Sequence, residues 1–256
     1  MNIQELYQKK LISAQDLAER VENGWVLGMD AAPTQTDAIV SAVCERAKSG
    51  VLTDVTVHTM LDSYPFAFYA DASFNGKVNG VSWFSGGGAR KAIAAGYADY
   101  IPNYYRDTMK LIRDHYAYDA FCVSVSPMDK HGYFSLATTS SYSEAMISKA
   151  KRIFIEVNSF QPRAVCNTQL HISQVDAIVE NSHPLPVLPP VKLDETSITI
   201  GNSGYYTMNS SEGGMDNMTK LFLMVDICVA VVLILLACIV FIRYAKKQKK
   251  AKAKKA

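Results

Sequence analysis

Apolar and polar positions along the first 180 residues follow a pattern that predicts helices and strands in turn. Ser13 precedes apolar positions at helical spacing, with Asp16 three residues on and Gly24 at the end, which predicts a short helix capped at both ends. Further helices are predicted over about 36–48, PNYYRDTMKLIRDHY and SEAMISKAKR. The predicted strands are residues 25–29, DVTVHTM, VNGVSWF at 78–84, YDAFCVSVS and IFIEVN.

This succession predicts an α/β domain with an open, largely parallel sheet and flanking helices. YDAFCVSVS is continuously apolar, as is typical of a strand buried on both faces. In sheets of this kind, ligands bind beyond the carboxyl ends of the strands. SPMDKHGYFSL, residues 126–136, starts where that buried strand ends, so its position favours a functional loop.

The texture of the chain changes after Pro184. HPLPVLPPVKLDE is rich in proline, and the Gly/Ser/Asn-rich residues 196–220 read as a linker. Residues 221–242 are apolar apart from Asp226, and a helix of that length, about 33 Å, predicts a transmembrane span. The prediction is therefore a domain over 1–195, a linker, this helix and a basic tail over 243–256.

Charge is divided unevenly along the chain. Eight of the 26 basic side chains lie in 243–256, which leaves 18 basic and 24 acidic residues, a net charge of −6, before the tail. An acidic body argues against nucleic acid as a partner, whereas a basic segment beside a membrane helix favours anionic lipid on the cytoplasmic face. We therefore expect a cytoplasmic body, anchored to the membrane through 221–242.

The tail also raises a conflict over topology. Positive charges after a single span favour a cytoplasmic C-terminus and would place the body outside, yet MNIQELYQKK is not a signal peptide. Three explanations stay open: a tail anchor against the charge rule, a helix packed on a protein partner or at the interface, or a recombined or frameshifted end over the last 60 residues. Because the C-terminal helix and basic tail do not fit a body that has no signal peptide, a truncated gene product is favoured.

The polar residues of SPMDKHGYFSL allow several kinds of chemistry. Asp129 and His131 could supply two metal ligands, but no third ligand follows a matching pattern, so no metal is expected. A Ser–His–Asp relay lacks the GxSxG elbow. The simpler alternative is a polar turn, in which Asp129 caps backbone amides and Gly132 permits a positive φ. The five cysteines show no CxxC spacing and predict neither disulfides nor a zinc site.

SGGGAR, residues 85–90, is a second candidate. The glycines could offer backbone amides to a phosphate with an arginine nearby, through Gly86, Gly87, Gly88 and Arg90. The segment fits neither GxGxxG nor the P-loop pattern, so a tight strand-to-helix turn is the simpler interpretation.

Four stretches, in order, resemble the acetyl-CoA hydrolase/transferase family, which includes the acetate, butyrate and 4-hydroxybutyrate CoA-transferases. SPMDKHGYFSL resembles the family signature S-P-x-D-x-H-G-Y-x-S. The other three are ARKAIAAGYADYIPNYY, FIEVNSFQPR and QLHISQVDAIVENSHPLP, and LPPVKLDE is similar to the segment that joins the family's two halves. The resemblance covers about residues 5–195, the N-terminal half of such an enzyme.

The resemblance implies a CoA-transferase fold and a coenzyme A thioester as substrate, with no bound cofactor. A glutamate carboxylate attacks an acyl-CoA, and the resulting glutamyl-CoA thioester passes CoA to a second carboxylate such as acetate. The implied partners are acyl-CoA, a short-chain carboxylate, and a complementary half or a homo-oligomer. The residues placed in a substrate-pocket or interface loop are Ser126, Pro127, Asp129, His131, Gly132, Tyr133 and Ser135.

The chain departs from the family after about residue 195. The catalytic glutamate lies in the family's second half, and only Glu212, in NSSEGGMD, is a weak counterpart here. We therefore expect the chain alone to be inactive, and a half-enzyme to expose an apolar face. The alternative is an inactive, membrane-tethered remnant or interaction module of the same fold. The sequence does not specify which acyl group is transferred.

Overall fold

The computed structural model describes residues 2–166, 168–187 and 194–202. The chain forms two units, residues 1–187 and 188–256, of which the first contains the sheet. The second unit contributes one described helix, α8 (Glu195–Asn202). No helix in the described ranges has the length and apolar character that a bilayer crossing requires. The predicted span at 221–242 and the tail at 243–256 lie outside the described residues.

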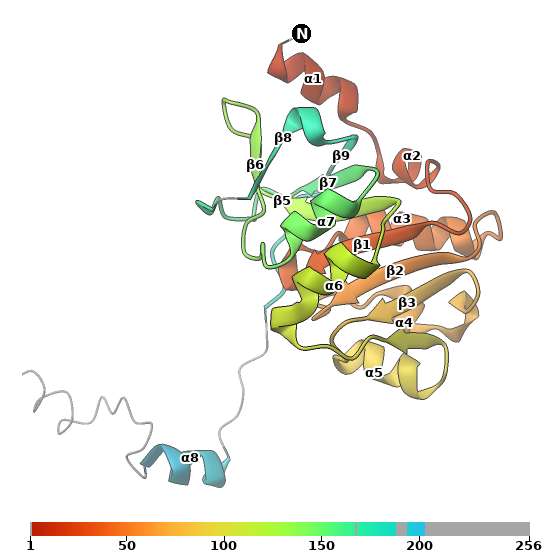
Figure 1. Cartoon of the computed structure of the whole chain (residues 1–256), viewed down its shortest axis with the longest axis vertical. Helices are drawn as coiled ribbons and strands as arrows, with labels where there is room; N and C mark the ends of the chain where they lie inside the picture. Colours follow the sequence, from red (N-terminus) through yellow and green to blue (C-terminus); the bar gives the residue numbers. More distant parts are fainter. Residues whose placement is uncertain (1, 167, 188–193, 203–256) are drawn as a thin grey trace, which may run out of the picture. The chain divides into compact units, whose positions relative to one another are not determined.

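Strands and helices alternate through the first unit (Figure 1). The strands are β1 (Val26–Ala31), β2 (Val55–Met60), β3 (Val78–Ser82), β4 (Ala98–Tyr100), β5 (Ala120–Val125), β6 (Tyr133–Ser135), β7 (Ile153–Val157), β8 (Gln169–His171) and β9 (Ala177–Glu180). The α-helices are α1 (Ile3–Lys10), α2 (Ala14–Ala18), α3 (Asp37–Lys48), α4 (Ala67–Ala70), α5 (Gly87–Ala94), α6 (Thr108–His115) and α7 (Ser143–Lys149). Four short 3₁₀ turns are η1 (Ala32–Thr34), η2 (Ala72–Phe74), η3 (Tyr105–Asp107) and η4 (Ile172–Gln174).

Seven strands form one sheet in the order β4-β3-β2-β1-β5-β7-β9, and every neighbouring pair is parallel. β1 is central, because it pairs with β2 on one side and with β5 on the other. β6 and β8 form a separate antiparallel pair. The prediction of an open, largely parallel sheet is confirmed.

Side chains alternate between two apolar layers, one on each face of the sheet. Leu27 and Cys122 belong to the layer that contains α2, α3, α4 and α5. Phe121 and Val123 belong to the opposite layer, with α6 and α7, which pack against each other (Figure 1). All six residues of β5 are buried, as the continuous apolar run predicts.

One glycine is required by close packing. A Cβ built on Gly80 in β3 would lie 2.3 Å from Tyr69 Cε1 and 2.8 Å from Phe68 Cδ2. Real Cβ atoms do not approach other atoms so closely, and both rings belong to the buried core. The sheet therefore meets α4 at a point where only a hydrogen fits.

The predicted helix at 36–48 is confirmed as α3, but the prediction that a helix extends from Ser13 to Gly24 is wrong. Ser13 caps the start, accepting from the Asp16 N–H, yet α2 ends at Ala18. Arg46 Nη1 donates to the carbonyl oxygens of Ala18, at 2.8 Å, and of Val21. A guanidinium from α3 thus satisfies the carbonyls where the helix stops.

Candidate functional site

The strand order reverses between β1 and β5, so the carboxyl ends of these strands border a crevice. Three loops meet at this edge: residues 31–36 after β1, 126–132 after β5 and 158–164 after β7. Side chains from one loop hydrogen-bond to the backbone of another, as the following contacts show. This convergence makes the edge the candidate functional site.

The β1 turn is strained and held by hydroxyl groups. Ala32 has a φ of +52°, a conformation that alanine rarely adopts. The Ala31 carbonyl accepts from the Thr34 hydroxyl at 2.7 Å and from the Thr139 hydroxyl at 2.9 Å, and the two hydroxyl groups also contact each other. Nothing in the sequence pattern points to this arrangement, because alanine gives no signal for a positive φ.

Asp30, at the end of β1, is a fully buried carboxyl group. Oδ1 accepts from the Ala31 N–H at 2.8 Å, and the Ser143 hydroxyl from α7 donates to Oδ2. Burial raises the pKa of Asp30 to about 7, although both hydrogen bonds act in the opposite direction. This residue was not predicted, and it places a carboxyl group that titrates near neutral pH beside the crevice.

The loop after β5 folds back on itself. Asp129 Oδ1 accepts from the N–H groups of His131, at 2.8 Å, and Tyr133, at 2.9 Å, and these bonds lower the pKa of Asp129. Gly132 has a φ of +88°, and a Cβ there would lie 2.9 Å from His171 Nε2. The segment therefore has both features of the polar turn expected from the sequence: Asp129 caps backbone amides, and Gly132 adopts a positive φ.

The two serines of the signature are also engaged in local structure. Ser126 Oγ accepts from the Ser135 N–H at 3.1 Å, and Ser135 Oγ donates to the Ala164 carbonyl at 3.0 Å. Both side chains are buried, and Ser135 links β6 to the loop after β7. Lys130, His131 and Tyr133 are exposed, so these polar side chains face solvent.

Arg163 joins the signature loop to the loop after β7. Its Nη2 donates to the carbonyl oxygens of Tyr133, at 2.7 Å, and Pro127, at 3.3 Å. Its Nη1 lies 3.5 Å from Asp129 Oδ2, an ion pair that supports the same geometry. Two segments that are about 30 residues apart in the chain are thus held as one surface.

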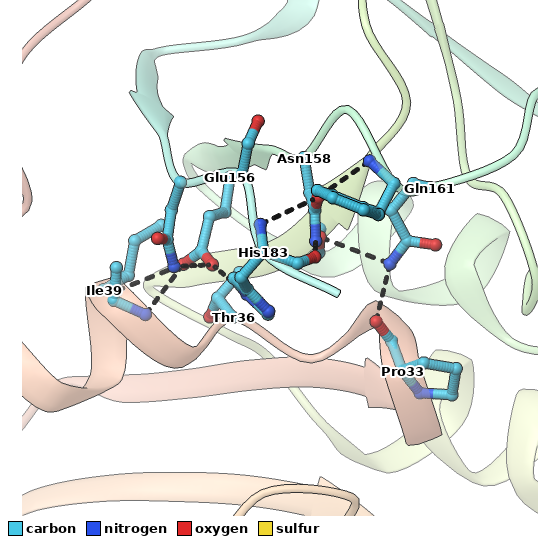
Figure 2. Close-up of polar contacts among 12 residues, drawn as sticks. Pro33, Thr36, Ile39, Glu156, Asn158, Gln161 and His183 are labelled. Atoms are coloured by element: carbon cyan, nitrogen blue, oxygen red, sulfur yellow. Dashed lines mark hydrogen bonds and ion pairs between the residues drawn. The ribbon is translucent and has the colours of Figure 1, made fainter. Parts of the chain in front are cut away.

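Glu156 in β7 is a buried carboxylate that caps a helix from a distance (Figure 2). Oε2 accepts from the N–H groups of Ala38, at 3.0 Å, and Ile39, at 3.3 Å, in the first turn of α3. Oε1 accepts from Asn181 Nδ2 at 2.9 Å and lies 3.9 Å from His183 Nε2. Burial raises the pKa of Glu156, against the effect of these donors.

Glu156 takes the place of the usual cap. Thr36 precedes α3 but makes no side-chain cap bond; its hydroxyl contacts Met29 Sδ instead. Beside it, Asn158 Oδ1 accepts from the Phe160 N–H at 2.9 Å, and Asn158 Nδ2 donates to the His183 carbonyl at 2.9 Å (Figure 2). The loops after β7 and β9 are therefore fixed together.

Gln161 crosses the crevice (Figure 2). Nε2 donates to the Pro33 carbonyl at 2.6 Å and to Ser124 Oγ at 3.3 Å. Oε1 is buried and has no hydrogen-bond partner among the described residues. An unsatisfied buried acceptor costs about 1–3 kcal/mol, so the unpaired Oε1 lowers the free energy of unfolding compared with a fully bonded amide.

The glycine segment lies at a different part of the same edge. Gly86 precedes α5, Gly87 and Gly88 form its first turn, and no side chain caps this end. Arg90 Nη2 donates to the Ser85 carbonyl at 3.1 Å. Gly87, Gly88, Asp62, Tyr64 and Lys91 line a half-open groove of about 620 Å³. β3 and β5 are separated by two strands, so the structure does not unite this turn with the signature loop.

The sequence also raised candidates for metal ligands, Asp129 and His131, and for a nucleophile, Glu212. Among the described residues, no group of three His, Cys, Asp or Glu side chains is arranged to hold a metal ion. Asp129 and His131 are linked instead through the His131 backbone N–H. Glu212, the weak candidate for a nucleophile, lies outside the described residues.

Comparison with known proteins decides the family. Residues 1–189 match the acetyl-CoA hydrolase/transferase N-terminal domain. The chain belongs to this family. The four ordered segments that suggested the resemblance all lie within the matched residues, so that prediction is confirmed.

Curated relatives in this family are CoA-transferases. Succinyl-CoA:cyclohexane-1-carboxylate CoA transferase of Geobacter metallireducens is 34% identical over 194 residues, which cover 75% of this chain and 44% of the relative. 4-Hydroxybutyrate coenzyme A transferase of Clostridium kluyveri is 28% identical over 204 residues, covering 79% and 47%. The chain thus spans about half the length of the curated relatives it matches.

Solved structures agree on the fold. RipA from Yersinia pestis is similar at a TM-score of 0.70 and 30% identity, over 76% of this chain and 47% of that chain. 4-Hydroxybutyrate CoA-transferase from Porphyromonas gingivalis matches at a TM-score of 0.60 and 20% identity, over 74% and 43%. The parallel sheet and its flanking helices are therefore those of a CoA-transferase.

Proposed function

We propose that this chain supplies the N-terminal half of a CoA-transferase, which moves CoA between an acyl-CoA and a carboxylate such as acetate. The observation that carries the proposal is the contact between two family segments at the crevice. SPMDKHGYFSL and FIEVNSFQPR are held together by Arg163, at the edge of the sheet where α/β proteins bind ligands. The family match over 1–189 supports the same assignment.

In the proposed reaction, a glutamate carboxylate attacks the thioester carbonyl of acyl-CoA and releases the CoA thiolate. The thiolate then attacks the glutamyl carbonyl, which gives a glutamyl-CoA thioester and frees the first carboxylate. The reverse sequence with a second carboxylate completes the exchange. We assign the nucleophilic glutamate to the second half of the enzyme, and the walls of the substrate site to the three loops of this half.

The carboxyl edge of the sheet also exposes large apolar side chains. Five large apolar side chains in loops that follow strands at this edge are 49–72% exposed, namely Leu61, Phe84, Tyr104, Tyr105 and Phe160. Isolated exposed apolar residues are common, but five in the loops of one sheet edge favour an interface. We propose that the complementary half packs here, and that the sheet edge and this half enclose the substrate together.

An exchange assay tests the function. The purified chain is incubated with acyl-CoA and acetate, alone and with the C-terminal half of a related transferase, and glutamyl-CoA is trapped with borohydride. We expect exchange only in the mixture, with the trapped glutamate in the added half. The control is the same half with its nucleophilic glutamate changed to alanine, which should abolish exchange.

Each contrary result is informative. Exchange by the chain alone would place the nucleophile within it and refute the assignment to the second half. No exchange in the mixture, although the two halves bind each other, would refute the proposed activity.

A further inference from the structure

Gln161 joins three segments of the crevice through a single side chain (Figure 2). It is 3% exposed, and its Nε2 donates both to Pro33 in the β1 turn and to Ser124 in β5. Its own backbone N–H donates to the Asn158 carbonyl at 3.0 Å, which fixes it within the loop after β7. The other end of the amide, Oε1, has no partner in the described part of the chain.

The chemistry of Pro33 determines which end of the amide faces it. A carbonyl oxygen only accepts, so the group 2.6 Å away must be the NH₂ group. Exchanging the two ends would bring two acceptors into contact. Oε1 is therefore the unsatisfied atom, and a buried leucine of similar bulk would avoid this defect. The amide thus keeps one unsatisfied atom buried while it donates to the Pro33 carbonyl, a bond that leucine could not make.

The amide acts on a strained turn. Ala32, directly before Pro33, has a φ of +52°, which alanine keeps only where its surroundings enforce it. Two threonine hydroxyls hold the carbonyl of Ala31 before the strained residue, and Gln161 holds the carbonyl of Pro33 after it. The Gln35 side chain anchors the far end of the turn to Asp62 and Ser63, so Gln161 is the side chain that holds the Pro33 carbonyl between these two anchors.

We propose that Gln161 is a positioning residue, which holds the turn at 31–35 in its strained conformation so that the turn can form one wall of the acyl-CoA site. It acts through the Pro33 carbonyl and does not touch the reacting atoms. This inference rests on the proposed function for its role in catalysis, whereas the conformational effect can be measured on the chain without substrate.

Hydrogen exchange of the full chain tests the conformational effect. Gln161→Leu keeps the bulk and removes both bonds of the amide. The Gln35 N–H, which donates to the Ala32 carbonyl at 3.1 Å, reports on the turn. We expect its exchange to be at least tenfold faster in Gln161→Leu. The Asn158 N–H is the reference, because it donates to Val125 at 3.0 Å outside the turn, and it should change less than threefold.

Two more variants distinguish a specific effect of Gln161 on the turn from a loss of stability of the whole domain. Ser124→Ala removes only the longer bond of Gln161, and we expect Gln35 exchange to stay within threefold of wild type. Glycine adopts a positive φ without strain, so adding Ala32→Gly to Gln161→Leu should return Gln35 exchange to within threefold of wild type. If the leucine variant does not fold, Gln161→Met replaces it with the same expectations.

Three results would overturn the proposal: unchanged exchange at Gln35, equal acceleration at Gln35 and Asn158, or no rescue by Ala32→Gly. The last two would mean that Gln161 supports the domain as a whole.

Activity in the assembled enzyme gives the second readout. We expect Gln161→Leu to lower kcat about tenfold and to change KM for acyl-CoA less than twofold, since the turn is displaced and the rest of the binding surface is kept. An unchanged kcat would contradict a role in catalysis. If the wild-type mixture is inactive, the proposed function fails, and hydrogen exchange still decides whether Gln161 holds the turn.

Discussion

Asp30 should make the stability of the domain depend on pH near neutrality, and Asp30→Asn should remove that dependence. Burial raises the pKa of Asp30 from 3.8 to about 7 in the folded chain. Between these values the unfolded chain has lost a proton that the native protein keeps. The unfolded state therefore binds fewer protons, and stability falls as the pH rises through this window.

The size of the effect follows from the pKa difference. Each pH unit is worth about 1.4 kcal/mol, so a rise from 3.8 to about 7 amounts to roughly 4 kcal/mol. That is a large share of the 5–15 kcal/mol typical of a folded domain. The stabilising contribution is complete below about pH 4, declines through the window, and is lost above about pH 7.

Urea unfolding at pH 4, 5.5, 7 and 8 measures this, followed by the fluorescence of the buried Trp25 and Trp83. The quantity of interest is the free energy of unfolding of Asp30→Asn minus that of wild type. Because other titrating groups cancel in the difference, it should rise by about 4 kcal/mol from pH 4 to pH 7 and then level off. The asparagine keeps the shape of the side chain, with Oδ1 placed to accept from the Ala31 N–H and Nδ2 placed to donate to the Ser143 hydroxyl oxygen.

Asp119→Asn is the control with the opposite sign. Burial opposes the shift, but Lys151 and the Val26 N–H lower the pKa of Asp119 below its ordinary value. Its stabilising contribution is present above about pH 4 and is lost in acid, so this variant should lose stability relative to wild type as the pH rises from acid. A pH-independent difference for Asp30→Asn would refute the reasoning, because it would show that Asp30 is already ionised in the native state.

Two further predictions concern the stability of the sheet. Glu156→Ala leaves the N–H groups of Ala38 and Ile39 without an acceptor and should lower the free energy of unfolding by about 3 kcal/mol. Glu156→Gln should lose less. A loss below about 1 kcal/mol for Glu156→Ala, measured by urea unfolding, would contradict the capping role. Gly80→Ala should cost about 3 kcal/mol through the clash with two rings, whereas Gly86→Ala, whose Cβ would meet nothing closer than 3.8 Å, should leave the melting temperature nearly unchanged. Equal effects of the two alanines would count against steric exclusion at Gly80.

The fold was accessible from the sequence because its signals are local. Period-two alternation in DVTVHTM and the continuous apolar run of YDAFCVSVS reflect burial on one or both sides of a strand, and both became strands of the central sheet. The order of helices and strands then implied parallel pairing. The end of α2 was mispredicted because Arg46, 28 residues away from Ala18, satisfies carbonyls that the local pattern assigned to a longer helix.

The candidate site was accessible only where it coincides with a contiguous motif. The turn of SPMDKHGYFSL could be anticipated from Asp129 and Gly132. Asp30, Glu156 and Gln161 were missed, because their partners lie 113, 118 and 128 positions away in the sequence. A carboxyl group near the end of a strand, or an amide in a loop, looks like an exposed polar position until tertiary contacts bury it.

The pairing of β1 has a consequence for synthesis of the chain. β1 to β4 can assemble as soon as residue 100 has emerged, but the other edge of β1 pairs with residues 120–122. A nascent chain of intermediate length therefore presents a central, apolar strand with one unpaired edge. Such edges template aggregation, and closing long loops between parallel strands is slow. We expect stalled chains whose emerged part ends between residues 100 and 119 to bind holdase chaperones, and chains long enough to expose all of β5 to be released.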